Sequence, residues 1–346
     1  MPLALRAFVT ATATALVFAQ PTIAADVRWL TQTQQNNAQY PAEIAAIEAA
    51  GASGFTVNRN EFQVLGLNLA DALRMASIGT FQIVTAQVGS AAKDDPFLEG
   101  IDLIGVSTDM AELRTAVDAY RDAFNARLGE RFGVKALAIW PFGPQVFLCN
   151  QPVESLDSLR GLKVRSFTAS MSEMLADVGA TPVTLSFPEV YPALQRGVAS
   201  CGVTSPTSAN TGKWPEVTTH VYPLAVSGSV QAHIVNLDWL NALSAEDQAA
   251  LTKVMSDMEA QLWDLATTTN DTALACTTAD DCPEGGLYTA YNLTLVPVSD
   301  ADKARVTEIA VEKILPEWAG RCAATFPDCA KVWNETIGAA RGLSIQ

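Results

Sequence analysis

The sequence predicts an α/β protein folded as two lobes. Stretches with strand character alternate with helical stretches, and this alternation is typical of parallel sheets whose faces are covered by helices. The length of 346 residues corresponds to about two domains at roughly 100–200 residues each. No internal repeat, low-complexity tract or long linker separates the halves. We therefore expect two lobes joined by short crossings of the chain.

The first half pairs short apolar strands with amphipathic helices. Gly51 and Gly54 separate the first helix from the second strand, Asn68 is placed to cap a helix, and Gly79 ends that helix. Asp109 begins a long amphipathic helix, and the apolar run after it is typical of a buried strand. The expected strands are Val27–Leu30, Phe55–Arg59, Phe81–Val84 and Val134–Trp140. The expected helices are Tyr40–Ala50, one that follows Asn68, and Asp109–Phe132.

The second half continues this style and adds one very long helix. Ser244 and the two acidic residues of the following turn form a helix start, and apolar residues then keep a helical period to about Ala275. The expected strands are a short one ending at Val164-Arg165, Pro182–Leu185, Gly202–Thr204, His233–Asn236 and Leu293–Val296. The other expected helices are Ser170–Val178, Glu189–Arg196 and Asp300–Trp318.

The N-terminus has the pattern of a secretory signal peptide. A single cation, Arg6, precedes an apolar run over Ala7–Ala19, and small residues end at Ala24-Ala25. The alternative is a membrane anchor, but the run is shorter than the ~20 residues that a spanning helix needs. We expect an exported protein, located in the periplasm, with the signal peptide removed near Ala24/Ala25. The mature chain is not expected to insert into a membrane.

Six cysteines fit an exported chain, in which an even number favours disulfides. Two pairs are close in sequence, which leaves a third pair whose members each end an apolar run. Free buried thiols are the main alternative, and a metal site would need tighter clusters. The expected bridges are Cys276–Cys282, Cys322–Cys329 and Cys149–Cys201.

Composition excludes several classes of function. The formal net charge is −15, and a nucleic-acid binder needs clustered Lys and Arg instead. Nucleophile-elbow, P-loop and zincin motifs are missing from the sequence. The two histidines, His220 and His233, are expected to be structural, and the pairs Asp94-Asp95 and Asp280-Asp281 to face solvent. We therefore expect no enzyme, no cofactor and no metal.

One stretch carries a specific resemblance. Residues 157–165 read DSLRGLKVR, residues 179–182 read GATP, and residues 189–197 read EVYPALQRG. In this order and spacing they resemble the extracytoplasmic solute receptors of tripartite ATP-independent periplasmic (TRAP) transporters, whose pattern is D-L-K-G-L-K-x-R, G-A-x-P and E-V-Y-x-A-L-Q-x-G. Weaker likeness extends over most of the mature chain.

The resemblance implies a periplasmic-binding-protein-like fold in which the long helix spans the lobes. It divides the chain into a signal peptide (1–25), a first lobe (26–147 and 233–275, with the spanning helix) and a second lobe (148–232 and 276–346). The implied function is to bind a small organic anion, most simply a carboxylate, in the cleft and to deliver it to integral-membrane permease subunits. Arg165 matches the family's arginine that pairs with the ligand carboxylate, for which a planar guanidinium is well suited.

Two positions depart from the family pattern. Gln145 stands where many members have a second arginine, and an amide cannot balance a second negative charge. Thr204 lies near the family's ligand-contacting asparagine, and we expect its hydroxyl to contact the ligand, with a structural turn as the alternative. Both departures argue against a sialic-acid or dicarboxylate specificity.

Other candidates follow from their places at the ends of motifs and strands. Aromatic candidates for the cleft, with core packing as the alternative, are Trp140, Phe142, Phe167 and Trp214. Polar candidates are Gln87, Thr31 and Gln32. Two other functions stay open at this stage: a receptor of an ATP-driven importer, which a neighbouring ATPase gene would indicate, and an exported α/β enzyme, which turnover of the ligand would indicate.

Overall fold

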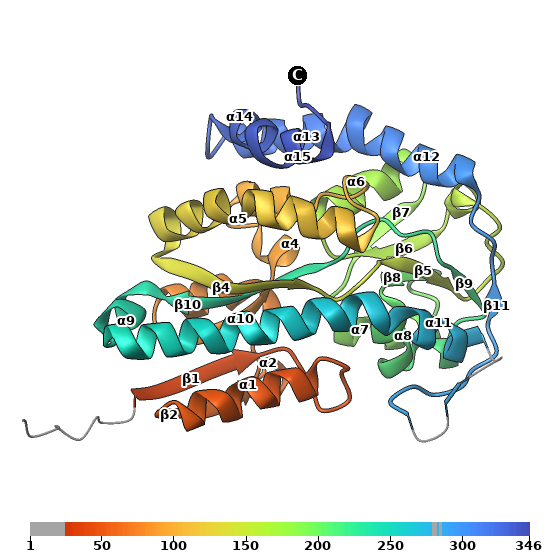
Figure 1. The fold of residues 1–346 in the computed structure, drawn as a ribbon. Coiled ribbons are helices and arrows are strands. Elements are labelled where there is room, and N and C mark those ends of the chain that lie inside the picture. The colour runs from red at the N-terminus through yellow and green to blue at the C-terminus, as the bar shows by residue number, and fades with distance from the viewer. Residues whose placement is uncertain (1–24, 279–281, 284–285) are drawn as a thin grey trace, which may run out of the picture.

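The computed structural model describes residues 25–278, 282–283 and 286–346. The signal peptide, except for Ala25, and the pair Asp280-Asp281 lie outside the described residues. The expectation that Asp94-Asp95 faces solvent is wrong for Asp95, which is buried because Arg127 pairs with its carboxylate at 2.6 Å. The α/β fold is confirmed, with two separate sheets side by side (Figure 1). We call each sheet, with the helices packed on it, a lobe.

The first sheet has five strands in the order β2-β1-β3-β10-β4. The chain order does not predict the place of β10, which lies between β3 and β4 and runs antiparallel to both. The expectation of purely parallel strands is therefore wrong here, because β10 returns from the second lobe and enters the sheet from the opposite end. The bounds are β1 Ala25–Thr31, β2 Phe55–Glu61, β3 Ile83–Gln87, β4 Val134–Pro141 and β10 Val230–Asn236.

The second sheet has six strands in the order β11-β9-β5-β8-β6-β7. It is also mixed, since β6 is parallel to β7 and β8, whereas β5 is antiparallel to β8 and β9. The bounds are β5 Val146–Cys149, β6 Lys163–Ser166, β7 Thr181–Thr184, β8 Cys201–Thr204, β9 His220–Tyr222 and β11 Thr294–Leu295.

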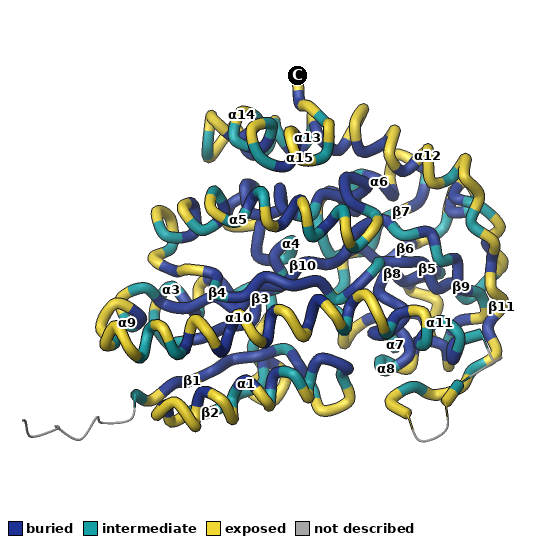
Figure 2. Tube along the Cα trace, in the orientation of Figure 1, coloured by how far each residue is buried: buried dark blue, intermediate teal, exposed yellow. Residues whose placement is uncertain are grey.

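Helices cover both sheets and bury most of the strands, as Figure 2 shows, whereas β7 and β11 are more exposed. In the first lobe these are α1 Tyr40–Ala52, α2 Phe62–Leu65, η1 Leu69–Asp71, α3 Ala72–Ser77, α4 Val88–Ala91, η2 Pro96–Asp102, α5 Met110–Phe132 and α9 Leu237–Ala242. In the second lobe they are η3 Leu156–Leu159, α6 Ala169–Asp177, α7 Phe187–Gln195, α8 Pro206–Thr211 and η4 Trp214–Glu216. Over the described part of the chain, no helix is both long and apolar enough to cross a bilayer.

The expected long helix is present and runs along both lobes (Figure 1). It starts as α10 (Ala245–Thr268), where the Ser244 side chain accepts a hydrogen bond from the Asp247 main chain at 3.0 Å. A break at Thr269 separates it from α11 (Asn270–Thr278). Because α10 packs against α1 and β4 whereas α11 packs against α8, the two helices connect the lobes.

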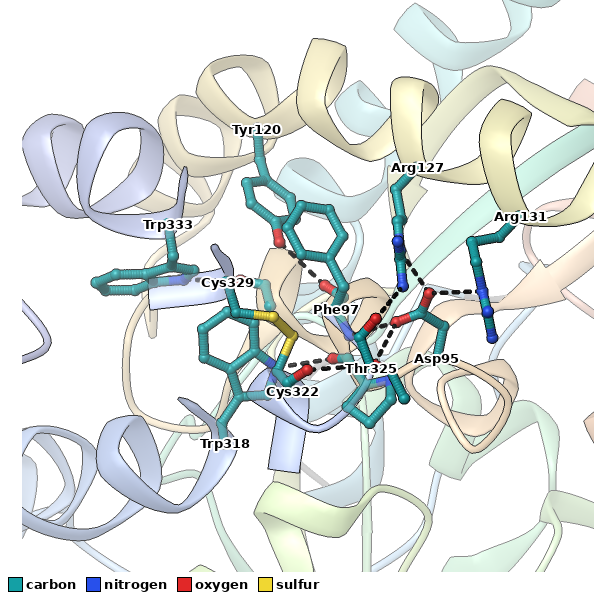
Figure 3. The surroundings of a disulfide bond; sticks show 12 residues. Asp95, Phe97, Tyr120, Arg127, Arg131, Trp318, Cys322, Thr325, Cys329 and Trp333 are labelled. Atoms are coloured by element: carbon teal, nitrogen blue, oxygen red, sulfur yellow. Dashed lines mark hydrogen bonds and ion pairs between the residues drawn. A yellow bond between two sulfur atoms is a disulfide. The ribbon is translucent and has the colours of Figure 1, made fainter. Parts of the chain in front are cut away.

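The C-terminal helices lie over α5 and α6, so they touch both lobes. Around the disulfide drawn in Figure 3, two indole N–H groups reach the η2 segment: Trp318 donates to the Pro96 carbonyl at 2.7 Å and Trp333 to the Gly100 carbonyl at 3.1 Å. These helices thereby hold η2 against α5. The elements are α12 Asp300–Ile309, η5 Ala310–Ile314, α13 Leu315–Ala323, α14 Cys329–Trp333, η6 Asn334–Gly338 and α15 Ala339–Arg341.

All three expected disulfides are confirmed. Cys149 and Cys201 are paired partners on the adjacent strands β5 and β8, with Cα atoms 4.0 Å apart. The other two bridges close short loops, Cys276–Cys282 after α11 and Cys322–Cys329 between α13 and α14. The division into lobes at the expected residue boundaries stays a prediction.

Candidate ligand-binding site

A cavity of about 940 Å³ lies between the two lobes. Its wall is built where strands end. Gln32 follows β1 and Phe167 follows β6. The last residues of β3, β7 and β8 also line it: Gln87, Thr184 and Thr204. Ligands of open α/β sheets bind outside the carboxyl ends of strands, and this cavity has the size of a small-molecule site.

Arg165, near the end of β6, is the centre of the second lobe's wall. Its side chain is 4% exposed. Nε donates to the Leu185 carbonyl at 3.0 Å and Nη1 to the Val203 carbonyl at 2.7 Å. An arginine has five N–H donors, so most of this fork is left to face the cavity. No carboxylate of the described residues forms an ion pair with it.

Aromatic rings and burial determine the environment of the Arg165 guanidinium. The guanidinium carbon lies 4.5 Å from the centre of the Phe167 ring and 5.8 Å from that of Trp214, distances typical of cation–π contacts. Burial lowers the pKa of Arg165 to about 9, and the field of Glu189 partly offsets this effect. The side chain therefore stays protonated at neutral pH but lacks the solvation that a cation normally has.

Besides Arg165, six residues expected from the sequence line the cavity: Gln32, Gln87, Phe142, Gln145, Phe167 and Thr204. Gln145 is buried in the crossing from β4 to β5, where its Nε2 donates to the Gly143 carbonyl at 2.9 Å. The Gln87 side chain caps α4 by accepting a hydrogen bond from the Ser90 main chain. These amides are thus fixed by the backbone before any ligand enters.

Three expected residues do not line the cavity. The Trp140 ring is buried in the first lobe, where its Nε1 donates to Nδ1 of His233 at 3.0 Å. Trp214 packs behind Arg165 and stacks on Phe187 with ring centres 5.3 Å apart. The Thr31 hydroxyl donates to Glu43 at 2.7 Å, beneath the wall. The reason is the same in each case, since a partner from another element takes the polar atom or the ring face.

Sequence reasoning missed many of the lining residues, and Phe187 and Ser229 are two examples. Phe187 lies at the start of α7, just before the EVYPALQRG motif, so its place next to that motif was an available signal. Ser229 lies in the crossing from β9 to β10 and has a φ of 55°, a left-handed conformation that is uncommon for a residue other than glycine. The short run Ser227-Gly228-Ser229 gives no comparable signal in one sequence.

Several hydrogen bonds cross from one lobe to the other around the cavity. The Ser170 main chain donates to Glu99 at 2.8 Å, the Ser90 hydroxyl donates to the Phe167 carbonyl at 3.3 Å, and Asn36 donates to the Thr211 carbonyl at 3.1 Å. The chain crosses between the lobes from β4 to β5 and from β9 to β10. These two crossing segments pair, since the main-chain N–H of Gln145 donates to the Ser227 carbonyl at 2.8 Å. This arrangement is a two-lobed enclosure whose lobes are joined by two hydrogen-bonded crossing segments.

A two-lobed α/β fold whose cavity holds a buried arginine is that of a solute-binding receptor. Comparison with family models agrees: residues 70–286 match the model of the bacterial extracellular solute-binding proteins of family 7 (DctP). The chain belongs to this family, which is a family of transport receptors rather than of enzymes. The resemblance stated from the motifs is thereby confirmed.

Individual relatives are more distant. The C4-dicarboxylate-binding periplasmic protein DctP of Rhodobacter capsulatus is 27% identical over 205 residues, which are 59% of this chain and 61% of that protein. The sialic acid-binding periplasmic protein SiaP of Vibrio cholerae is 30% identical over 125 residues, 36% of this chain and 39% of that one. The match thus spans less than two thirds of either relative. The crystal structure of DctP6 of Bordetella pertussis, a receptor binding pyroglutamic acid, superposes with a TM-score of 0.78 at 19% identity, covering 92% of this chain and 100% of the other.

Proposed function

We propose that this protein is the extracytoplasmic receptor of a TRAP transporter. It binds a small organic acid between its lobes through a carboxylate on Arg165 and delivers it to integral-membrane permease subunits. The observation that carries the proposal is the buried guanidinium of Arg165, which lines the cavity with free donors and no acidic partner among the described residues. Family membership supports it, and the relatives named above bind acids according to their names.

The proposal includes export and closure. The N-terminal pattern over residues 1–25 supports a signal peptide that is removed near Ala24/Ala25, and the cysteine pairs suit an oxidising compartment. The lobes open about the paired crossings and close on the ligand, and ligand contacts favour the closed state. In an open state the interlobe hydrogen bonds of Glu99, Ser90 and Asn36 would be broken.

A thermal-shift screen of mature protein against organic acids and neutral compounds tests the function. A ligand that binds only the folded protein stabilises it by RT ln(1 + [L]/Kd), about 2.7 kcal/mol at one hundred times Kd. We expect carboxylates to raise the melting temperature and their uncharged analogues to leave it unchanged. Binding of a neutral compound in preference to every acid would overturn the proposal, as would conversion of the ligand to a product.

A further inference from the structure

The cations that line the cavity, apart from Arg165, are already paired with carboxylates. Lys93 lies 3.6 Å from Asp71 and is half exposed, so solvent and that carboxylate both stabilise its ammonium group. Arg321 is 3.3 Å from Glu99 and also pairs with Glu173. The remaining lining acid, Glu189, closes a capping box by accepting from the Ser186 main chain at 2.8 Å.

Arg165 is therefore the one cation of the described wall that forms no ion pair with a carboxylate. A buried cation is stabilised strongly by one anionic group with good hydrogen-bond geometry. A second negative charge on the same ligand would enter a low-dielectric space without a counter-charge, and burial of an unpaired charge is costly.

The rest of the polar wall is neutral, and amide and hydroxyl side chains provide its hydrogen-bond donors and acceptors. Gln145 uses its Nε2 on the Gly143 carbonyl, so its Oε1 is the atom left to accept. Gln32 likewise donates through Nε2, to Gln231. Gln87 accepts through Oε1 from the Ser90 main chain, which leaves its Nε2 to donate. Such a set recognises hydroxyl, amide or ring carbonyl groups.

We propose that the ligand is a monoanion: one carboxylate held by Arg165, joined to an uncharged end that hydrogen-bonds Gln32, Gln87 and Gln145. This inference rests on the proposed function and narrows it, because it excludes dicarboxylates of the same size. The amides of Gln145 and Gln32 still offer an acceptor oxygen and one N–H each, so they suit an uncharged polar group, but they cannot balance the charge of a second carboxylate.

Matched pairs of acids test the proposal by isothermal titration at pH 7.5. The pairs are succinamate with succinate and D-galacturonate with galactarate, and pyroglutamate is a further monoanion. We expect at least one monoanion to bind, and its doubly charged partner to bind at least tenfold more weakly. A dianion that binds as tightly as its partner, or binds alone, overturns this inference but leaves the proposed function intact. If none of the five acids binds, the acid found by the thermal-shift screen is titrated in their place, and a dianion found there overturns this inference.

The Gln145→Arg variant supplies a second test in the same assay. The added cation is expected to lower the ratio of the dianion's Kd to the monoanion's Kd at least tenfold. Gln145→Glu is expected to weaken the binding of all five acids. Trp140→Phe, which lies outside the cavity, is the control and should keep the wild-type preference. Unchanged preference in a folded Gln145→Arg protein would show that this wall does not contact the second end of the ligand.

Discussion

The Nη1 atom of Arg165 donates a hydrogen bond to the main-chain carbonyl of Val203 at 2.7 Å. Together with the bond from Nε to Leu185, it joins β6 to β8 and to the residue after β7. The guanidinium is thus oriented by the fold itself before ligand arrives. Pre-oriented donors lose less freedom on binding, which suits an anchor for a carboxylate.

Replacing Arg165 by alanine should weaken both binding and folding. Loss of one member of a buried charged pair costs about 2–5 kcal/mol, which is roughly 30- to several thousand-fold in Kd. Because two main-chain carbonyls also lose their donor, we expect a fall of about 1–3 kcal/mol in the free energy of unfolding. Titration and urea denaturation measure the two effects separately.

Arg165→Lys is the matched control for charge. An ammonium group keeps the charge but has no planar fork, so we expect binding between that of the alanine variant and wild type. If the Arg165→Ala variant is folded and binds the acid as tightly as wild type, Arg165 does not hold the ligand.

Gln145→Ala should have a smaller effect than Arg165→Ala. A neutral hydrogen bond contributes about 0.5–1.5 kcal/mol, which is roughly two- to thirteen-fold in Kd. Trp140→Phe is the comparison, since it removes only the bond to His233 and should lower stability without changing Kd. Equal losses of affinity in the two variants would contradict the placement of Trp140 outside the cavity.

The disulfides should differ in their contribution to stability. The chain-entropy estimate is about 4 kcal/mol for the bridge with a sequence separation of 52, Cys149–Cys201. It is about 2 kcal/mol for Cys276–Cys282, with a separation of 6. We therefore expect the double alanine variant of the first pair to lose more stability in denaturant melts. The reverse order would mean that packing or strain, rather than loop closure, sets the effect.

Asp102 should make stability depend on pH. Its carboxylate accepts hydrogen bonds from the main chains of Val230 at 3.0 Å and Gly228 at 3.3 Å, in the crossing that contains Ser229. Burial raises the pKa of Asp102 from 3.8 to about 7, although these hydrogen bonds oppose the shift. Between these values the native state holds a proton that the unfolded state has lost. The stability that the Asp102 proton contributes is therefore complete below about pH 4 and is lost as the pH rises through 7.

The Asp102→Asn variant isolates that contribution. Asparagine does not titrate. The fall in the free energy of unfolding with rising pH should therefore be smaller by up to about 1.4 kcal/mol per pH unit, the limit for one proton. Urea denaturation of both proteins at several pH values between 4 and 8 measures the difference in the free energy of unfolding. A difference that is constant over this range would assign the proton to another group.

Local chemistry makes much of this protein predictable from its sequence. Asp109 does cap α5 by accepting from the Ala111 main chain at 2.8 Å, and Asn68 caps η1 by accepting from that of Ala70 at 2.9 Å. The alternation of strands and helices, the cysteine pairs and the motif around Arg165 likewise depend on nearby residues or on fixed spacing. These features give the fold class, the disulfides and the family.

Only the tertiary structure decided which side chains face the cavity. Trp140 and Gln145 are five positions apart near the same crossing, yet His233 holds Trp140 in the core while Gln145 lines the wall. The antiparallel entry of β10, which brings His233 to β4, is itself a contact between distant segments. The balance of the lining charges likewise depends on Arg321, which reaches Glu99 from the C-terminal helices. Burial and charge pairing are set by such long-range contacts, and a local sequence pattern carries no record of them.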